Sequence, residues 1–236
     1  MKHQYFGDIN DYAKYSILRA MGTHDTLRIG VCWMLTDKLH PRDGRKTGYL
    51  SEPNKWRLLD PHVYDFLRET VHVRRERSCK LVENSRLLHN ATYFADPIED
   101  DRDSRAQYFD RVLNWTADRN VIFFDPDNGL EVGSIPYGRK DSSKYLFFRE
   151  LSSVFESAKS VVVFQHFPRE NRDRYILRRA NEIRVATQAR SVQCFRTSTV
   201  AYLIAAQNSH LDMLQTCGRS VADKWNGKIH FSPDVR

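Results

Sequence analysis

Two acidic residues and an amide follow an apolar run near the middle of the chain. In the stretch FFDPDNGLEV at 123–132, Asp125, Asp127 and Asn128 come directly after two phenylalanines. Carboxylates at the end of a buried strand can position a water, hold a metal ion or grip a base, whereas Asp-Pro and Asn-Gly also favour a plain turn. We favour a functional role, because a turn accounts for the amide and the glycine but not for two acids at this position.

A second polar pair ends another apolar run. Gln165 and His166 lie in the stretch SVVVFQHF at 160–167, where the imidazole is either an acid–base group or a satisfied core histidine. If the two runs are neighbouring strands, their polar side chains share one cleft at the carboxyl ends. Gln165 is then expected to contact the substrate. The predicted catalytic residues are Asp125, Asp127, Asn128 and His166.

Polar residues also crowd the stretch GDINDYAK at 7–14, just before an apolar helical pattern. They can simply cap and solvate a helix, with Asp8 as its N-cap, or they can contact a ligand. We expect the ligand role. The predicted substrate-binding residues are Asp8, Asn10, Asp11, Lys14 and Gln165. Asp37 and Asp43 are further candidates for functional acids, but no role is assigned to them.

The charge balance of the chain is basic. The 236 residues carry a formal net charge of +7, which favours an anionic partner such as nucleic acid, although a merely soluble basic protein is the simpler alternative. An arginine-rich helical pattern at 169–190 follows the proposed site, and guanidinium forks suit phosphate oxygens. The predicted DNA-phosphate contacts are Arg169, Arg172, Arg174, Arg178 and Arg179.

Apolar runs alternate with helical spacing along the chain, which predicts βα units. The fold class expected is α/β, with a doubly wound, mostly parallel Rossmann-like sheet and helices on both faces. One domain is expected over 1–236, with a possible helical insertion at about 52–78. The expected strands are 27–35, 79–84, 91–96, 120–125, 160–167 and 228–232, with a long strand or hairpin at 191–207. The expected helices are 9–21, 60–71, 104–119 (capped by Ser104), 142–158 and 169–190.

Composition excludes several classes of protein. No apolar run reaches the length of about 18 residues that a transmembrane helix needs, and the first residues lack the apolar core of a signal peptide. The four cysteines are far apart and form no C-x-x-C, which argues against a structural zinc site and a disulfide scaffold. We therefore expect a cytoplasmic protein with no membrane partner; its oligomeric state is left open.

Scattered motifs resemble those of bacterial 23S rRNA adenine-N6 methyltransferases. GDINDYAK is similar to their signature G-N-x-x-D-x-x-K-H, with Gly7, Asp8, Asp11 and Lys14 in the motif positions and Tyr15 in place of histidine. DPDN at 125–128 stands where the family has D-P-P-[YF]. The resemblance implies a Rossmann-like fold and S-adenosylmethionine chemistry. The chain departs from the family in having no glycine between residues 32 and 41 to cradle that cofactor, and an amide where the family stacks an aromatic ring.

A second, local resemblance is to uracil-DNA-glycosylase-like enzymes. DPDNG, SSKYLFFREL and QHFPREN look similar in kind to the acidic loop, the following helix and the histidine loop of those enzymes, although the two loops lie closer together in this sequence. The resemblance implies that Asp125 activates water and that His166 grips the base.

These observations lead us to expect a DNA-processing enzyme, and a DNA glycosylase in particular. It would hydrolyse the N-glycosidic bond of a flipped-out, possibly modified base and leave an abasic site, without a cofactor or a metal, in a role such as antiviral defence. Three alternatives stay open: a nucleic-acid methyltransferase with a degenerate cofactor loop, a metal-dependent nuclease, and a non-catalytic nucleic-acid-binding module. The base, and the choice between DNA and RNA, are not determined by the sequence.

Overall fold

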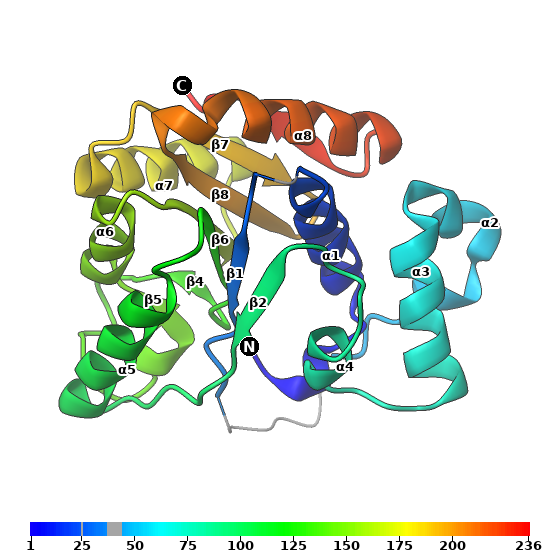
Figure 1. The fold of residues 1–236 in the computed structure, drawn as a ribbon, viewed down its shortest axis with the longest axis horizontal. Helices are drawn as coiled ribbons and strands as arrows, with labels where there is room; N and C mark the ends of the chain where they lie inside the picture. Colours follow the sequence, from blue (N-terminus) through cyan, green and yellow to red (C-terminus); the bar gives the residue numbers. More distant parts are fainter. Residues whose placement is uncertain (25, 37–43) are drawn as a thin grey trace.

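A seven-stranded sheet forms the centre of the structure. In the computed structural model, which describes residues 1–24, 26–36 and 44–236, the strand order is β2-β1-β3-β6-β8-β7-β9 (Figure 1). The strands are β1 Ile29–Cys32, β2 Ala91–Phe94, β3 Val121–Phe124, β6 Ser160–His166, β7 Ser191–Arg196, β8 Val200–Ala206 and β9 His230–Ser232. Strands β2, β1, β3 and β6 pair in parallel, whereas β8 runs against both β6 and β7, and β9 runs against β7. The expected α/β fold with a large, mostly parallel sheet is confirmed.

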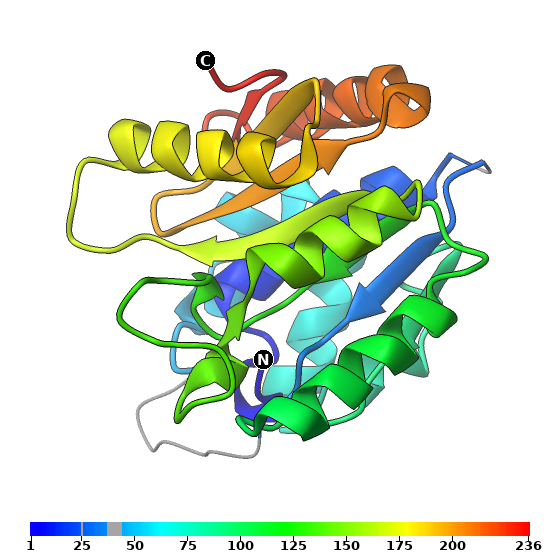
Figure 2. The ribbon, with the colours of Figure 1, turned by 90° about the vertical axis from the view of Figure 1, so that its left-hand side faces the viewer.

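Helices cover both faces of this sheet. The helices on one face are α1 Ile9–Gly22, α3 Pro61–Arg68 and α8 Leu211–Lys224; those on the other are α5 Arg102–Trp115, α6 Phe148–Glu156 and α7 Arg172–Thr187. In Figure 2, α5, α6 and α7 lie in front of the sheet, and α1 and α3 lie behind it. Side chains alternate along a strand, so Phe123 packs on the face covered by α1, α3 and α8, and Phe124 packs on the face covered by α5, α6 and α7. Burial on both faces explains why the strands are continuously apolar.

Most of the residues from 53 to 73, within the stretch 52–78 for which the sequence predicts a helical insertion, are helical. The stretch contains α2 Pro53–Trp56, α3 and a π-helical turn at Glu69–Val73, followed by the short α4 Lys80–Glu83. The cap predicted for α3 is confirmed, because Asp60 accepts a hydrogen bond from the backbone N–H of Val63. The helix at 80–83 corrects the strand expected at 79–84.

Three further local predictions had mixed outcomes. The hairpin at 191–207 is confirmed as β7 and β8. The cap of α5 is Asp101 and not Ser104, because the Asp101 side chain accepts from the Ser104 N–H. The helix expected over 142–158 is limited to α6, and the residues before it form a 3-10 turn and the strand β5 Tyr145–Leu146, which pairs with β4 Gly129–Leu130. No helix within the described residues is long and apolar enough to cross a membrane.

Candidate functional site

A cavity of about 360 Å³ opens where β3 and β6 end beside the start of α1. Strands β3 and β6 are hydrogen-bonded neighbours. The polar residues that follow them can therefore share one cleft, as expected if the two apolar runs were neighbouring strands. The predicted site residues that line the cavity are Asp8, Asn10, Asp11, Lys14, Asp125, Asp127 and His166. Three chain segments that are far apart in the sequence therefore contribute to one site.

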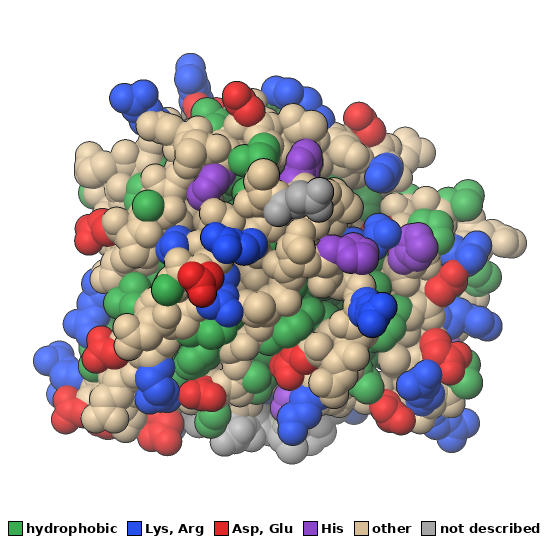
Figure 3. Space-filling model, in the orientation of Figure 1, with side chains coloured by type: hydrophobic (Ala, Val, Ile, Leu, Met, Phe, Trp, Pro, Cys, Tyr) green, Lys and Arg blue, Asp and Glu red, His purple; other side chains and the backbone are tan. Residues whose placement is uncertain are grey.

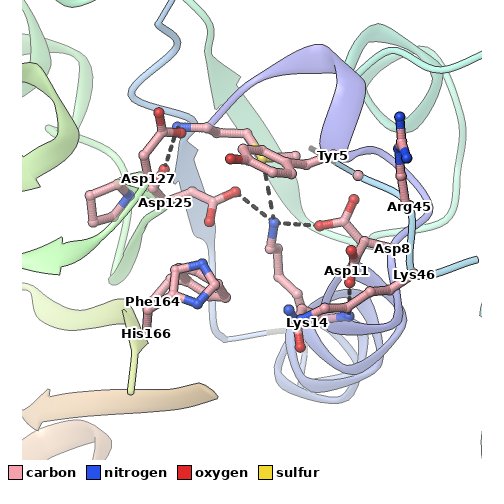
Figure 4. Close-up of a pocket in the computed structure, with 14 residues that line it drawn as sticks. Tyr5, Asp8, Asp11, Lys14, Arg45, Lys46, Asp125, Asp127, Phe164 and His166 are labelled. Atoms are coloured by element: carbon pink, nitrogen blue, oxygen red, sulfur yellow. Dashed lines mark hydrogen bonds and ion pairs between the residues drawn. The ribbon is translucent and has the colours of Figure 1, made fainter. Parts of the chain in front are cut away.

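Lys14 is at the centre of this site. Its ammonium Nζ lies 2.7 Å from Asp11 Oδ1 and 2.6 Å from Asp125 Oδ2, and it points into the cavity between the two carboxylates (Figure 4). All three residues are 2% exposed, and the rings of Trp33 and Phe164 lie within 6 Å of Nζ. A buried ammonium is costly unless it is paired, so the two acids account for a lysine at this position.

Burial and charge set the protonation of this group. Burial raises the pKa of Asp11 to about 6; Lys14 opposes that rise, and the charge of Asp125 adds to it. Although burial disfavours an ammonium, the carboxylates of Asp11 and Asp125 raise the pKa of Lys14 above its ordinary value. Lys14 is thus a fixed positive charge at neutral pH, and Asp11 takes up a proton far more readily than an exposed aspartate does.

Asp127 holds the first residues of the chain in place. Its Oδ1 lies 2.8 Å from the Met1 ammonium, and its Oδ2 accepts a 2.9 Å hydrogen bond from Thr36 Oγ1. Burial would raise the pKa of Asp127, but the nearby ammonium outweighs it and the pKa falls below its ordinary value. The Met1 ammonium also donates to the backbone carbonyls of Met34 and Asp125, which ties β1 to β3 beyond their ends.

Asp125 has one carboxylate oxygen engaged and one available. Lys14 contacts Oδ2, and within the described residues no donor contacts Oδ1. Because Asp125 lines the cavity, a water or a ligand placed there can reach this second oxygen. Lys14 holds the other oxygen and so fixes the orientation of the carboxylate.

His166 lies across the cavity from α1, at the end of β6. Its ring is half-buried and packs edge-on against Phe164, with ring centroids 4.9 Å apart. Burial, with a contribution from the charge of Lys46, lowers the pKa of His166 from its ordinary value of 6.5. The imidazole is therefore neutral at pH 7 and offers one N–H donor and one acceptor nitrogen.

Gln165 and Asn128 do not join the cavity, which corrects the expectation of a cleft shared by all five residues. Successive side chains of β6 point to opposite faces, so Gln165 faces away from His166. Its Oε1 accepts from the Leu130 N–H at 2.9 Å, and its Nε2 donates to the Asn128 carbonyl at 3.1 Å. A Cβ on Gly129, which has φ +118°, would lie 2.3 Å from that Nε2. Gln165 thus supports the loop after β3 from behind.

The arginines predicted to contact phosphate are placed differently from one another. Arg179 is buried, donates to the Glu131 carbonyl at 3.0 Å and pairs with Glu182 at 2.6 Å, so it does not face solvent. Arg178 is exposed and pairs with Glu170 at 2.6 Å. The other three are exposed: Arg169, Arg172 and Arg174. The buried Arg179 is therefore not placed for the phosphate contact predicted for it, whereas that prediction stands untested for the four exposed arginines.

The cavity also contains residues that sequence reasoning missed. Tyr5, Arg45 and Lys46 line it, and the two cations lie at one side of the cavity near Asp8 (Figure 4). The basic pair in the loop sequence RKTG was the only available signal. Asp37 and Asp43 lie outside the described residues. In the part of the chain that the structure describes, no three His, Cys, Asp or Glu side chains come together as a metal site would need.

Comparison with known proteins adds no identification. No model of a protein family matches the chain, and no curated protein matches its sequence.

Proposed function

We propose that the protein hydrolyses an N-glycosidic bond of a nucleotide unit bound in the Asp125–His166 cavity, with a base in DNA as the substrate. The observation that carries the proposal is the placement of Asp125 and His166 on one cavity from neighbouring strand ends. Breaking this bond builds positive charge on the sugar and negative charge on the departing base, so it needs a carboxylate on one side and a donor on the other.

In the proposed reaction, Asp125 Oδ1 orients a water toward C1′ of the sugar and offsets the developing positive charge. The water oxygen bonds to C1′, the C1′–N electron pair leaves with the base, and the base ends with one of the two water protons. The other proton remains on the new sugar hydroxyl. Lys14 fixes the orientation of the Asp125 carboxylate through Oδ2. A neutral His166 donates an N–H to the departing base, and no cofactor is required.

The size and charge of the cavity suit one nucleotide. Its volume of about 360 Å³ is at the lower end of the range for small-molecule sites, so it would take a single flipped-out base with its sugar. Arg45 and Lys46 supply positive charge at the lining, which suits the phosphate attached to that sugar.

The strand order is consistent with the finer fold prediction. We propose a doubly wound, Rossmann-like sheet, because β2 lies on one side of β1 and β3 on the other. In such sheets, ligands bind where the strand order reverses, beyond the carboxyl ends of the strands. Strand β3 borders this reversal on one side and the cavity on the other, because the cavity is lined from beyond the ends of β3 and β6.

A methyltransferase is the second candidate, because two segments that resemble the rRNA adenine-N6 methyltransferases meet in space. Asp11 and Lys14 of the first segment contact each other, and Lys14 contacts Asp125 of the second. The lack of a glycine between residues 32 and 41 weighs against the cofactor. A nuclease is less favoured: within the described residues, the Met1 ammonium and Thr36 contact both oxygens of Asp127, which leaves Asp125 Oδ1 as the one uncontacted oxygen of the pair for a magnesium ion.

The proposal is tested by single-turnover assays on duplex and single-stranded DNA containing normal and modified bases. The expected product is an abasic site, which gives strand breaks only after alkali or heat. Asp125→Asn and His166→Ala should each lower the rate by about 10²–10³. Asp65→Asn is the matched control, because Asp65 is an exposed carboxylate paired with Arg57 away from the cavity.

Other products would overturn the proposal in recognisable ways. Methyl transfer from labelled S-adenosylmethionine, or micromolar binding of that cofactor by calorimetry, would establish the second candidate. Direct strand cleavage that depends on magnesium would establish a nuclease. Full activity of both site variants would place the chemistry elsewhere.

A further inference from the structure

A second groove adjoins the candidate site, and Asn10 lines both. The groove has a volume of about 360 Å³ and lies between the start of α7, the turn joining β7 to β8, and the connection from α8 to β9. Asn10 connects the two sites physically, since its Oδ1 accepts a 2.9 Å hydrogen bond from Thr199 Oγ1 in that turn.

The groove gathers positive charge from three separate elements. Arg172 comes from α7, Arg196 from the end of β7, and Lys228 from the connection before β9; His230 lies beside them. None of the residues that line the groove is acidic. Among the described residues, the one carboxylate that pairs with these three cations is Asp173, 2.8 Å from Arg196 Nη1, and its side chain is 77% exposed.

This grouping is local and is not a consequence of overall charge. On the face shown in Figure 3, Lys and Arg side chains are mixed with Asp and Glu. The outer face of α7 is similarly mixed, because Arg178 there pairs with Glu170 and lies near Glu182. The groove therefore differs from the arginine-rich helix as a whole, of which it includes only Arg172.

The remaining lining is suited to a phosphodiester chain. In the turn, the hydroxyl of Thr197 donates to the Val200 carbonyl and that of Thr199 to Asn10 Oδ1. The exposed hydroxyl of Ser198 between them can donate to a phosphate oxygen. Trp56 also lines the groove, with Lys228 Nζ 5.4 Å from its ring centroid. Cations that follow a backbone, beside an aromatic surface, are the usual features of a nucleic-acid strand site.

We infer that this groove binds the phosphodiester backbone of the strand that carries the target nucleotide, and so extends the candidate site along that strand. Arg172, Arg196 and Lys228 would contact phosphates, while the target unit enters the cavity past Asn10. The inference rests on the proposed function for the identity of the target, but not for the binding itself.

The test is a pair of double variants that remove the same charge from different places. Arg196→Ala with Lys228→Ala removes two groove cations, and Arg174→Ala with Arg178→Ala removes two cations from the outer face of α7. Fluorescence anisotropy with labelled single-stranded and duplex oligonucleotides would measure affinity against salt concentration. The groove variant should lose about 10-fold or more in affinity, and its salt slope should fall by about 1.4–1.8 for two lost phosphate contacts. The α7 variant tests the phosphate contacts that the sequence predicts for Arg174 and Arg178. If the groove and not the outer face of α7 binds the strand, this variant should bind almost as the unchanged protein does, because Glu170 and Glu182 already offset the charge of Arg178.

The outcomes separate the two proposals. Equal losses of DNA affinity in the two double variants, or a larger loss in the α7 variant, would contradict the proposal that the groove binds the strand. Binding of poly-glutamate as tightly as the oligonucleotide at the same salt would overturn it in favour of an acidic protein partner. DNA binding that depends on the groove cations, without any abasic product, would support the proposed strand-binding role of the groove and contradict the proposed glycosylase activity. Circular dichroism and thermal unfolding of each variant establish that affinity losses are not losses of folding.

Discussion

Lys14 Nζ lies 2.6 Å from Asp125 Oδ2, which joins the first helix to the end of a central strand across 111 residues of sequence. The contact is buried, and the same ammonium also holds Asp11. A single lysine thus determines where the proposed catalytic carboxylate points. It also neutralises charge that the apolar surroundings would otherwise disfavour.

Lys14→Met should destabilise the fold strongly, because it leaves two buried carboxylates without their cation. Breaking a buried pair in this way costs about 3–5 kcal/mol, measurable by urea unfolding. Adding Asp11→Asn should recover part of the loss, since one of the two like charges is removed. Lys55→Met, at an exposed pair with Glu52, is the control and should change little. A Lys14→Met protein as stable as the parent would mean that the network is not structural.

Arg105→Lys should also be destabilising, although it preserves charge. Arg105 is fully buried, and its fork contacts both oxygens of Glu150 at 2.6 and 2.8 Å and the Ser142 carbonyl at 2.9 Å. Lysine cannot reproduce that fork, and each group left unsatisfied costs about 1–3 kcal/mol. Arg57→Lys, at the exposed bidentate pair with Asp65, is the matched control. Similar unfolding midpoints for both variants would contradict this account.

His166 should titrate below pH 6.5. Its pKa is lowered in the folded state, so the unfolded chain binds the proton more readily, and this residue reduces stability only as pH falls below 6.5. NMR of the imidazole C–H signals against pH, with His166→Ala for assignment, measures the midpoint. A midpoint above 6.5 would mean that the neighbouring carboxylates outweigh burial, and that His166 is cationic in part of the neutral range.

Gln165→Met should lower stability without lowering DNA affinity. The Gln165 side chain supports the loop at Asn128 and Leu130. Its loss leaves the Leu130 N–H without its acceptor, at about 1–3 kcal/mol, whereas the Asn128 carbonyl keeps the His166 N–H. Thermal unfolding and anisotropy on the same preparation distinguish the roles. Loss of affinity at unchanged stability would restore the substrate contact that the sequence suggested.

Much of the fold follows from patterns that are local in the sequence. Apolar runs at β3 and β6 and helical spacing at α1 and α7 were sufficient to predict the elements, and parallel strands explain why Asp125 and His166 meet. The strand expected at 79–84 failed because short apolar runs do not distinguish a strand from a helical turn.

Some features of the site can be predicted from local sequence patterns, and others cannot. Alternation along β6 already places Gln165 and His166 on opposite faces, and the spacing of Arg179 with Ile176 and Ile183 already places it on the buried face of α7. In contrast, no local pattern pairs Lys14 with Asp125 or the Met1 ammonium with Asp127, because these contacts depend on how distant segments pack.

The separation of 111 residues between Lys14 and Asp125 affects the order in which the chain can fold. At synthesis rates of about 5–20 residues per second, Asp125 emerges roughly 6–22 s after Lys14. Until then, no Asp125 is present to help offset the desolvation of Lys14, and contacts between distant residues form slowly in any case. A φ-value near zero for Ile17→Val would indicate late docking of α1, whereas a value near one would contradict it. The helix that begins the chain is thus expected to be among the last elements to reach its final position, and the site is completed only then.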